Sequence, residues 1–152
     1  MLKPLKVLLL GLWLLGCADS SNVEFYVLEP ISKAALPSQE NSKQHTIGIG
    51  PVTVPALLER KQIITRSSDN TVKIAESQQW ASPLQDTLLQ TLTRNLSDLQ
   101  ANHIIRTYPW SVHGTVDLQV IVDFIRFDTT PGISANLEAN WTIKNETSGE
   151  IL

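Results

Sequence analysis

The stretch from residue 116 to residue 144, VDLQVIVDFIRFDTTPGISANLEANWTIK, decides the fold class. In its first half apolar and polar residues alternate, and the alternation changes phase after Phe124. Residues 129–132 (TTPG) form a turn signal, and the alternation over residues 133–144 is strict. A period of two residues is typical of antiparallel strands with one buried face. The stretch therefore predicts a strand with a bulge after Phe124, a turn and a second strand.

One amphipathic helix is predicted over residues 83–100. Ser82 is a preferred N-cap residue, Pro83 suits the first helical position and Gln85 completes a capping-box pattern. A leucine stripe on one face of this helix is expected to pack against the sheet. The sequence thus predicts an α+β fold, with a mainly antiparallel sheet packed against an amphipathic helix. The stripe consists of Leu84, Leu88, Leu92, Leu96 and Leu99.

The first half of the chain contains weaker signals for further strands. Residues 32–45 are polar and indicate an exposed loop. The turn residues 67–70 (SSDN) predict a hairpin with a four-residue loop. Glycine and proline at 50–51 indicate a bulge within a strand. The expected elements are strands at 23–28, 46–55, 62–66 and 71–75, with a helical turn at 56–61.

Composition excludes several classes of protein. The chain has 152 residues, 12 Lys+Arg against 15 Asp+Glu, a net charge of −3 and 42% hydrophobic residues, which suits one globular domain. A pI near 5.5 argues against nucleic-acid binding, because such proteins need clustered cations. The single cysteine excludes an internal disulfide and a Cys-rich zinc site.

The N-terminus has the organisation of a bacterial secretion signal. Two lysines precede the apolar run 7–15 (VLLLGLWLL), which is too short to span a membrane. The run ends in Leu14-Leu15-Gly16-Cys17, which looks like the lipobox of bacterial lipoproteins. Cys17 is then the nucleophile that accepts a diacylglyceryl group. Cleavage before it exposes an amine for an N-acyl chain, typically palmitate.

This reading divides the chain into a signal peptide (1–16), a lipidated N-terminus with a short tether (17–22) and one domain (23–152). By resemblance to enterobacterial lipoproteins, aspartate directly after the lipidated cysteine retains a protein in the inner membrane. Ala18 stands at that position here. The expected location is therefore the periplasmic face of the cell outer membrane.

No catalytic or metal-binding pattern is found in the sequence. The histidines His45, His103 and His113 stand singly in predicted loops, without the spacing of a metal site. No Gly-x-Ser-x-Gly elbow is present. We therefore expect no enzymatic activity and no cofactor beyond the acyl chains on Cys17.

An aliphatic cluster around the helical turn is a candidate partner interface. It would lie outside the core if the turn is exposed. The cluster with its polar neighbours comprises Pro55, Leu57, Leu58, Arg60, Gln62 and Ile63.

Several segments, in order, resemble the PqiC/YmbA family of transport-auxiliary lipoproteins. After the lipobox come Tyr26-Val27-Leu28, the segment 47–55 (IGIGPVTVP) and the segment 58–66 (LERKQIITR). The later matches are Trp80-Ala81-Ser82-Pro83-Leu84, Pro109-Trp110, Val120-x-Val122-x-x-Phe124-x-x-Phe127 and Leu137-x-Ala139-x-Trp141.

The resemblance implies a docking subunit of a system that moves lipids between the two membranes and maintains envelope integrity. It implies a PqiB-like MCE tunnel protein as partner and assembly into a homo-oligomer. Family members continue beyond the equivalent of Leu152 with a strand and a second helix, which this sequence lacks. One face of the sheet would then be partly uncovered.

Two other functions remain open. One is an outer-membrane assembly or chaperone lipoprotein that binds a β-barrel or lipopolysaccharide machine. The other is a lipid-anchored periplasmic enzyme, which the absence of a nucleophile–base pattern disfavours.

Overall fold

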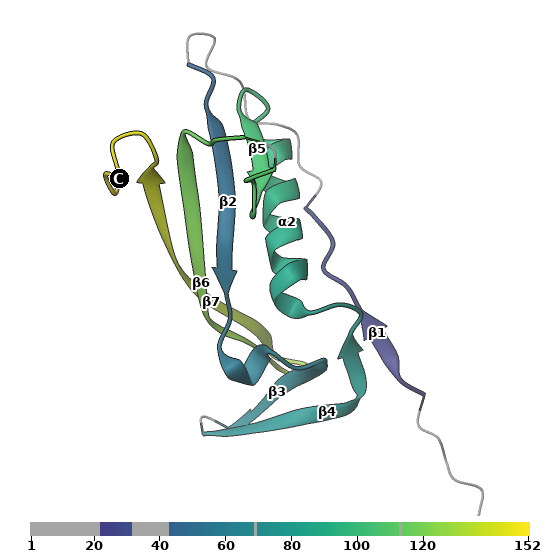
Figure 1. The fold of residues 1–152 in the computed structure, drawn as a ribbon. Coiled ribbons are helices and arrows are strands. Elements are labelled where there is room, and N and C mark those ends of the chain that lie inside the picture. Colours follow the sequence, from purple (N-terminus) through teal and green to yellow (C-terminus); the bar gives the residue numbers. More distant parts are fainter. Residues whose placement is uncertain (1–21, 32–42, 69, 113) are drawn as a thin grey trace, which may run out of the picture.

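The structure, a computed structural model, describes residues 22–31, 43–68, 70–112 and 114–152. One helix packs on a seven-stranded sheet within these residues (Figure 1). The elements are β1 (Glu24–Tyr26), β2 (Thr46–Thr53), the 3₁₀ turn η2 (Ala56–Leu58), β3 (Gln62–Ser68), β4 (Thr71–Trp80), α2 (Leu84–Leu99), β5 (Ile104–Thr107), β6 (Leu118–Thr130) and β7 (Ser134–Asn145).

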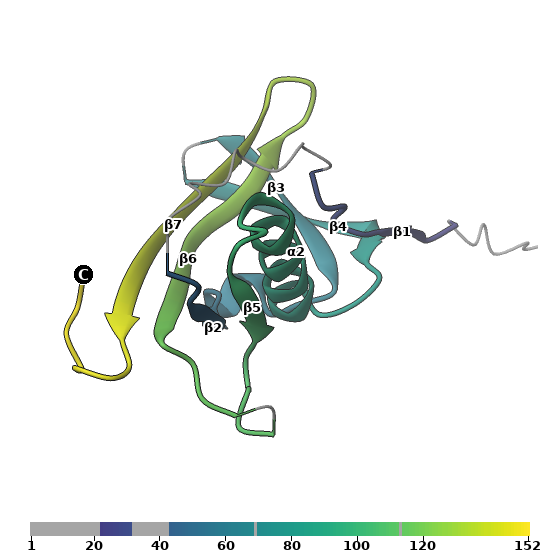
Figure 2. The ribbon, with the colours of Figure 1, turned by 90° about the horizontal axis from the view of Figure 1, so that it is seen from above.

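Strand β6 organises the sheet because it pairs with three other strands. β6 pairs with β7 along the whole length of β7, and it also pairs with β2. Its pairing with β3 is limited to one position, where Thr129 of β6 lies opposite Thr65 of β3. The strand order is β1-β4-β3-β6-β2-β5, so β1 and β5 lie at opposite ends of it. Figure 2 shows α2 over the sheet, with the long β6–β7 hairpin extending past it.

The predicted α+β fold, a sheet packed on an amphipathic helix, is confirmed. The two hairpins, β3–β4 and β6–β7, are antiparallel as predicted. The sheet is nevertheless mixed, because β2 runs parallel to both β5 and β6, and β1 runs parallel to β4. Alternation within a strand shows which face is buried, but it does not indicate the direction of a neighbour that is distant in sequence.

Both predicted bulges are confirmed by shifts of register. One shift lies between Ile49 and Val52 in β2, and the other lies between Phe124 and Arg126 in β6. Close packing explains the glycine at position 48, because a Cβ atom there would lie 2.7 Å from the indole ring of Trp110. The glycines of β2 thus make room for aromatic side chains.

Helix α2 lies where it was predicted, but the predicted capping box is wrong. Pro83 occupies the N-cap position, and no side chain caps the helix. The amide Nε2 of Gln85 instead donates a hydrogen bond of 2.8 Å to the carbonyl oxygen of Val52. This hydrogen bond ties the first turn of α2 to β2, in place of the reach back to the N-cap backbone that the capping box predicted.

The β3–β4 hairpin is longer than predicted. Ser68 pairs with Thr71, so the expected four-residue loop is wrong. Strand β4 continues to Trp80 because its last three residues pair with β1. The predicted helical turn is present as the short η2.

The core lies between α2 and the sheet. Leu84 and Leu88 of α2 are buried against side chains of β2, β3 and β6. Among the described residues, no helix is long and apolar enough to cross a membrane. The buried members of this cluster are Val52, Leu58, Ile64, Leu84, Leu88, Val122 and Phe124.

Candidate functional site

The residues predicted as a partner interface gather around two neighbouring hollows. The larger hollow, of about 320 Å³, has Leu58, Gln62 and Ile63 in its lining. The smaller, of about 70 Å³, has Pro55, Leu57 and again Leu58 in its lining. The prediction therefore selected residues that lie close together in space.

One predicted interface residue belongs to the core instead. Leu58 is only 6% exposed and packs in the central cluster, because the 3₁₀ turn points it inward. Leu57, its neighbour on the turn, is exposed. The Nε of Arg60 donates a hydrogen bond of 2.9 Å to the carbonyl oxygen of Leu57, which holds the guanidinium over the turn. Leu57 is therefore the turn residue most available to a partner.

The larger hollow has an aromatic wall and a polar rim. Trp80 at the end of β4 stacks on Phe127 of β6, with ring centroids 5.8 Å apart. Gln62, Gln78 and the edge-strand residue Tyr26 also line the hollow. A volume near 320 Å³ with mostly apolar walls is at the lower end of the range for ligand pockets.

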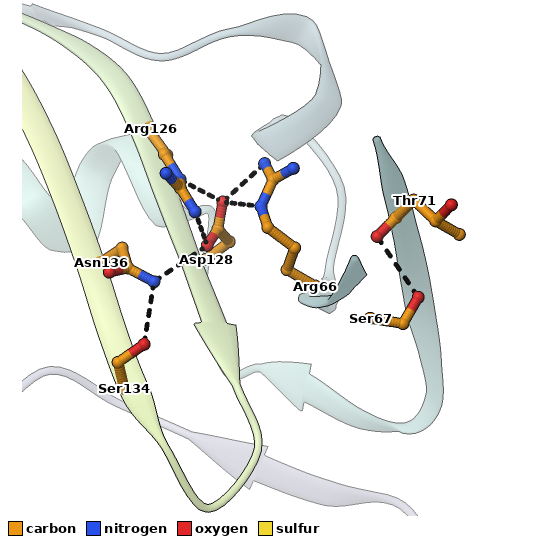
Figure 3. Close-up of polar contacts among 7 residues, drawn as sticks. All are labelled: Arg66, Ser67, Thr71, Arg126, Asp128, Ser134 and Asn136. Carbon is orange, nitrogen blue, oxygen red and sulfur yellow. Dashed lines mark hydrogen bonds and ion pairs between the residues drawn. The ribbon is translucent and has the colours of Figure 1, made fainter. Parts of the chain in front are cut away.

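A buried carboxylate, that of Asp128, lines both hollows. Figure 3 shows the polar contacts around it. Asp128 of β6 is 4% exposed. Oδ2 of Asp128 accepts hydrogen bonds from Nε and Nη2 of Arg66, at 3.1 and 2.9 Å, and from Nε of Arg126, at 2.6 Å. Its Oδ1 accepts from Nη2 of Arg126 at 3.0 Å and from Nδ2 of Asn136 at 3.4 Å. We call these four residues the Asp128 cluster.

Hydrogen bonds from Arg126 lower the pKa of Asp128 far below its usual value. Hydrogen bonds from Arg66 and the positive charges of both arginines act in the same direction, whereas burial opposes them. Asp128 is therefore ionised throughout the physiological range of pH.

The Asp128 cluster adds a connection between β3 and β6, which have little strand pairing with each other. β3 and β6 pair at a single position, Thr65 with Thr129. Arg66 extends from β3 to Asp128 on β6, and Asn136 extends to it from β7. The cluster therefore holds the β3–β4 hairpin, and with it the larger hollow, against the β6–β7 hairpin.

The sequence analysis did not identify Asp128. The bulge after Phe124 changes which residues of β6 face the core. The sequence pattern therefore did not show whether a charged residue after the bulge is buried or exposed. One feature of the sequence could have indicated a buried ion pair: Asp128 stands two positions after Arg126, on a strand expected to be half-buried.

An apolar groove of about 550 Å³ lies between α2 and the β6–β7 hairpin. Trp141 on β7 is 71% exposed at its margin, although it stands on the apolar side of the strand. This agrees with the expectation that one face of the sheet is partly uncovered. Its walls include Leu88, Leu92, Leu96, Val120, Val122, Phe124, Leu137 and Ala139.

Two of the histidines lie near each other, away from the Asp128 cluster. The backbone N–H of His45 donates to Nδ1 of His103 at 3.2 Å, and Nδ1 of His45 lies 3.9 Å from Oδ2 of Asp117. Among the described residues, no three His, Cys, Asp or Glu side chains are placed to hold a metal ion. His113 and the lipobox residues Leu14, Leu15, Gly16 and Cys17 lie outside the described residues, so the lipidation site stays a prediction.

Several known proteins are similar to this chain. The intermembrane transport lipoprotein PqiC of Escherichia coli K12 is 28% identical over 128 residues, which cover 84% of this chain and 68% of that protein. PqiC of Shigella flexneri matches with the same identity and coverage.

Solved structures share the fold. A crystal structure of an uncharacterised protein superposes with a TM-score of 0.70 at 20% identity, covering 86% of this chain and 74% of that one. A Xanthomonas campestris protein superposes with a TM-score of 0.66 at 14% identity, covering 84% and 72%.

Residues 26–152 match the family described as the ABC-type transport auxiliary lipoprotein component. This segment contains every described strand except the start of β1, together with both hollows and the Asp128 cluster. The resemblance to PqiC seen in the sequence is thereby confirmed, and the chain belongs to the family of ABC-type transport auxiliary lipoprotein components.

Proposed function

We propose that this protein is a non-enzymatic docking subunit of an MCE-type system that transports lipids between the two membranes. Acyl chains on Cys17 anchor it in the outer membrane, and its domain faces the periplasm. A PqiB-like tunnel protein is its partner, and it acts as a homo-oligomer. The observation that carries the proposal is the family match over residues 26–152, on a chain whose only cysteine stands in a lipobox.

The sequence before the domain supports the anchor. Leu14-Leu15-Gly16-Cys17 follows a short apolar run, and Ala18 stands where an inner-membrane lipoprotein has aspartate. One acyl chain gives only marginal membrane binding, so the anchor requires the diacylglyceryl and N-acyl chains together.

The surface around η2 supports docking as the activity. Leu57 is exposed beside the smaller hollow, and Ile63 and Gln62 border the larger one. An exposed aliphatic residue next to hollows with apolar walls can receive side chains of a partner. The Asp128 cluster fixes the β3–β4 hairpin, which carries Gln62 and Ile63, so this part of the surface is preorganised.

The docking surface can be tested by photocrosslinking in cells that express the lipidated protein. A photoreactive residue is placed at Leu57, Arg60 or Ile63, and the captured proteins are identified by mass spectrometry. Ile104 is a matched control, because it is apolar, about as exposed as Leu57 and on the edge strand β5, which is separated from β3 by β6 and β2. Capture of an MCE-domain protein from the three positions but not from Ile104 supports the proposal.

The other outcomes contradict specific parts of the proposal. Capture of a barrel-assembly or lipopolysaccharide component would favour the chaperone function. Self-crosslinks alone would make this surface an oligomer contact. Leu58 is unsuitable as a probe, because its replacement would disturb the core.

The anchor is tested separately by metabolic labelling with an alkyne analogue of palmitate and by membrane fractionation. We expect label on the wild-type protein in the outer-membrane fraction, and none on the Cys17→Ala variant. Label in the inner-membrane fraction would overturn the proposed location, and unlabelled wild-type protein would overturn the anchor itself.

A further inference from the structure

An exposed apolar stripe runs along the first described segment. Val23, Phe25 and Val27 are 42%, 65% and 60% exposed. On the other side of the segment, Tyr26 lines the larger hollow and Leu28 lines the apolar groove, although Tyr26 is 38% exposed and Glu24 is exposed as well. Alternate residues of an extended chain point to opposite sides. The three apolar side chains therefore share one side of the segment, and that side is largely exposed.

The stripe lies on an edge of the sheet. β1 pairs with β4 alone and ends the strand order, so its other edge has no neighbouring strand among the described residues. Figure 1 shows β1 beyond β4, at the periphery of the domain. The stripe is therefore carried by a strand at the edge of the sheet.

The stripe is close to the predicted anchor along the chain. Val23 is six residues after Cys17. A fully extended chain spans at most about 3.6 Å per residue, so Val23 lies within roughly 22 Å of Cys17 and Val27 within roughly 36 Å. So short a tether keeps the stripe near the membrane surface that holds the acyl chains.

The charges near the stripe indicate what kind of surface it fits. Residues 22–31 contain Glu24 and Glu29 and no lysine or arginine. Such a segment is not attracted to anionic headgroups, so its affinity for a membrane depends on the apolar side chains alone. A neutral lipid surface matches this chemistry.

We propose that Val23, Phe25 and Val27 insert into the interface of the bilayer that holds Cys17. The insertion gives the domain a second point of contact with the membrane and fixes the side that faces it. This inference rests on the lipid anchor of the proposed function. The opposite edge of the sheet, with β5, would then be turned away from the bilayer.

The test uses the unique cysteine. The chain from Cys17 to Leu152 is coupled through its thiol to a maleimide lipid in phosphatidylcholine vesicles, and a benzoylphenylalanine replaces Phe25. The matched control carries the same residue at Val112, which is apolar, 86% exposed and just after β5. We expect at least a fivefold higher yield of lipid adducts from position 25. Equal yields, or crosslinks to a second copy in place of lipid, would overturn the proposal.

A second measurement tests the side chains themselves. With the probe at Val23, the Phe25→Ser/Val27→Ser variant should form at least threefold fewer lipid adducts, whereas Val112→Ser should change nothing. Because both replaced residues are exposed, the variant should keep the thermal midpoint of the parent, and an unchanged adduct yield from a folded variant would overturn the proposal. Thiol coupling bypasses cellular lipidation, so failure here is distinct from failure of palmitate labelling at Cys17.

Discussion

Asp128 is a buried carboxylate that side chains from three strands hold in place. Arg66, Arg126 and Asn136 contact it from β3, β6 and β7. The side chains of Arg66 and Arg126 are 24% and 37% exposed, and the carboxylate of Asp128 compensates part of their positive charge. Removing one member of such a cluster costs more than the pair contributes, because it leaves the other charges poorly solvated.

We therefore expect Asp128→Asn to lower the free energy of unfolding by about 2 kcal/mol, below the range for fully buried pairs because both arginines are partly solvated. Urea denaturation at pH 7 measures the change. Asp98→Asn is a matched control on the exposed surface of α2, and it should change stability by less than about 0.5 kcal/mol. Equal losses in the two variants would show that the cluster has no special role.

The same cluster predicts a dependence of stability on pH. The pKa of Asp128 is lowered in the folded protein, chiefly by hydrogen bonds from Arg126. Its contribution is therefore fully present above the unfolded pKa of about 3.9, and it is lost as the pH falls toward the folded pKa. We expect the stability difference between wild type and Asp128→Asn to be constant from pH 7 to about pH 5 and to shrink below about pH 4. Urea midpoints at several pH values measure this, and a difference that grows in acid would contradict it.

At the scale of elements, local patterns predicted more than long-range ones did. The helix, both hairpins and both bulges were predicted, because each depends on residues that are near in sequence. The parallel pairing of β2 with β6 joins segments about seventy residues apart, and the alternation of apolar and polar residues within each segment does not indicate this pairing. For the same reason the candidate site was predicted only in part. The predicted residues Leu57, Gln62 and Ile63 are near one another in sequence. Asp128 is distant from them in sequence, and only the folded structure brings it to the same two hollows.

The start of α2 gives a direct test of tertiary contact against local capping. Ser82→Ala should change the free energy of unfolding by less than about 0.5 kcal/mol, because no side chain caps the helix. Gln85→Ala should lower it by about 1 kcal/mol, because it removes the hydrogen bond to the carbonyl of Val52. Chemical denaturation of the two variants decides the matter. The reverse order of effects would show that the capping box forms in solution.

At the scale of the whole molecule, the domain is unevenly covered. Helix α2 covers the central strands of the sheet but not all of the β6–β7 hairpin. The apolar groove lies between the helix and this hairpin, and the exposed Trp141 stands at its margin. Contiguous exposed apolar surface of this kind is uncommon on monomeric proteins and marks a contact surface. The sequence predicted a partly uncovered face, but it could not indicate which strand borders it.

The groove should bind hydrophobic dyes while the protein is folded. We expect Trp141→Ser to reduce the fluorescence of bound anilinonaphthalene sulfonate at least twofold, because this indole borders the apolar groove. Its thermal midpoint should change by no more than about 3 °C, since the side chain is mostly exposed. Val112→Ser, at an isolated exposed residue, should leave the fluorescence unchanged, and an equal decrease in both variants would place the dye elsewhere.

The central position of β6 also has a consequence for how the chain acquires its structure. The core cluster includes Val122 and Phe124 of β6, which follow all its other members along the chain. Closing loops of this length is entropically costly and slow, and the first hundred residues lack the strand that joins β2 to the β3–β4 hairpin. The sheet is therefore completed only when β6 is available, and we expect the domain to fold as one unit rather than from its first strands onward.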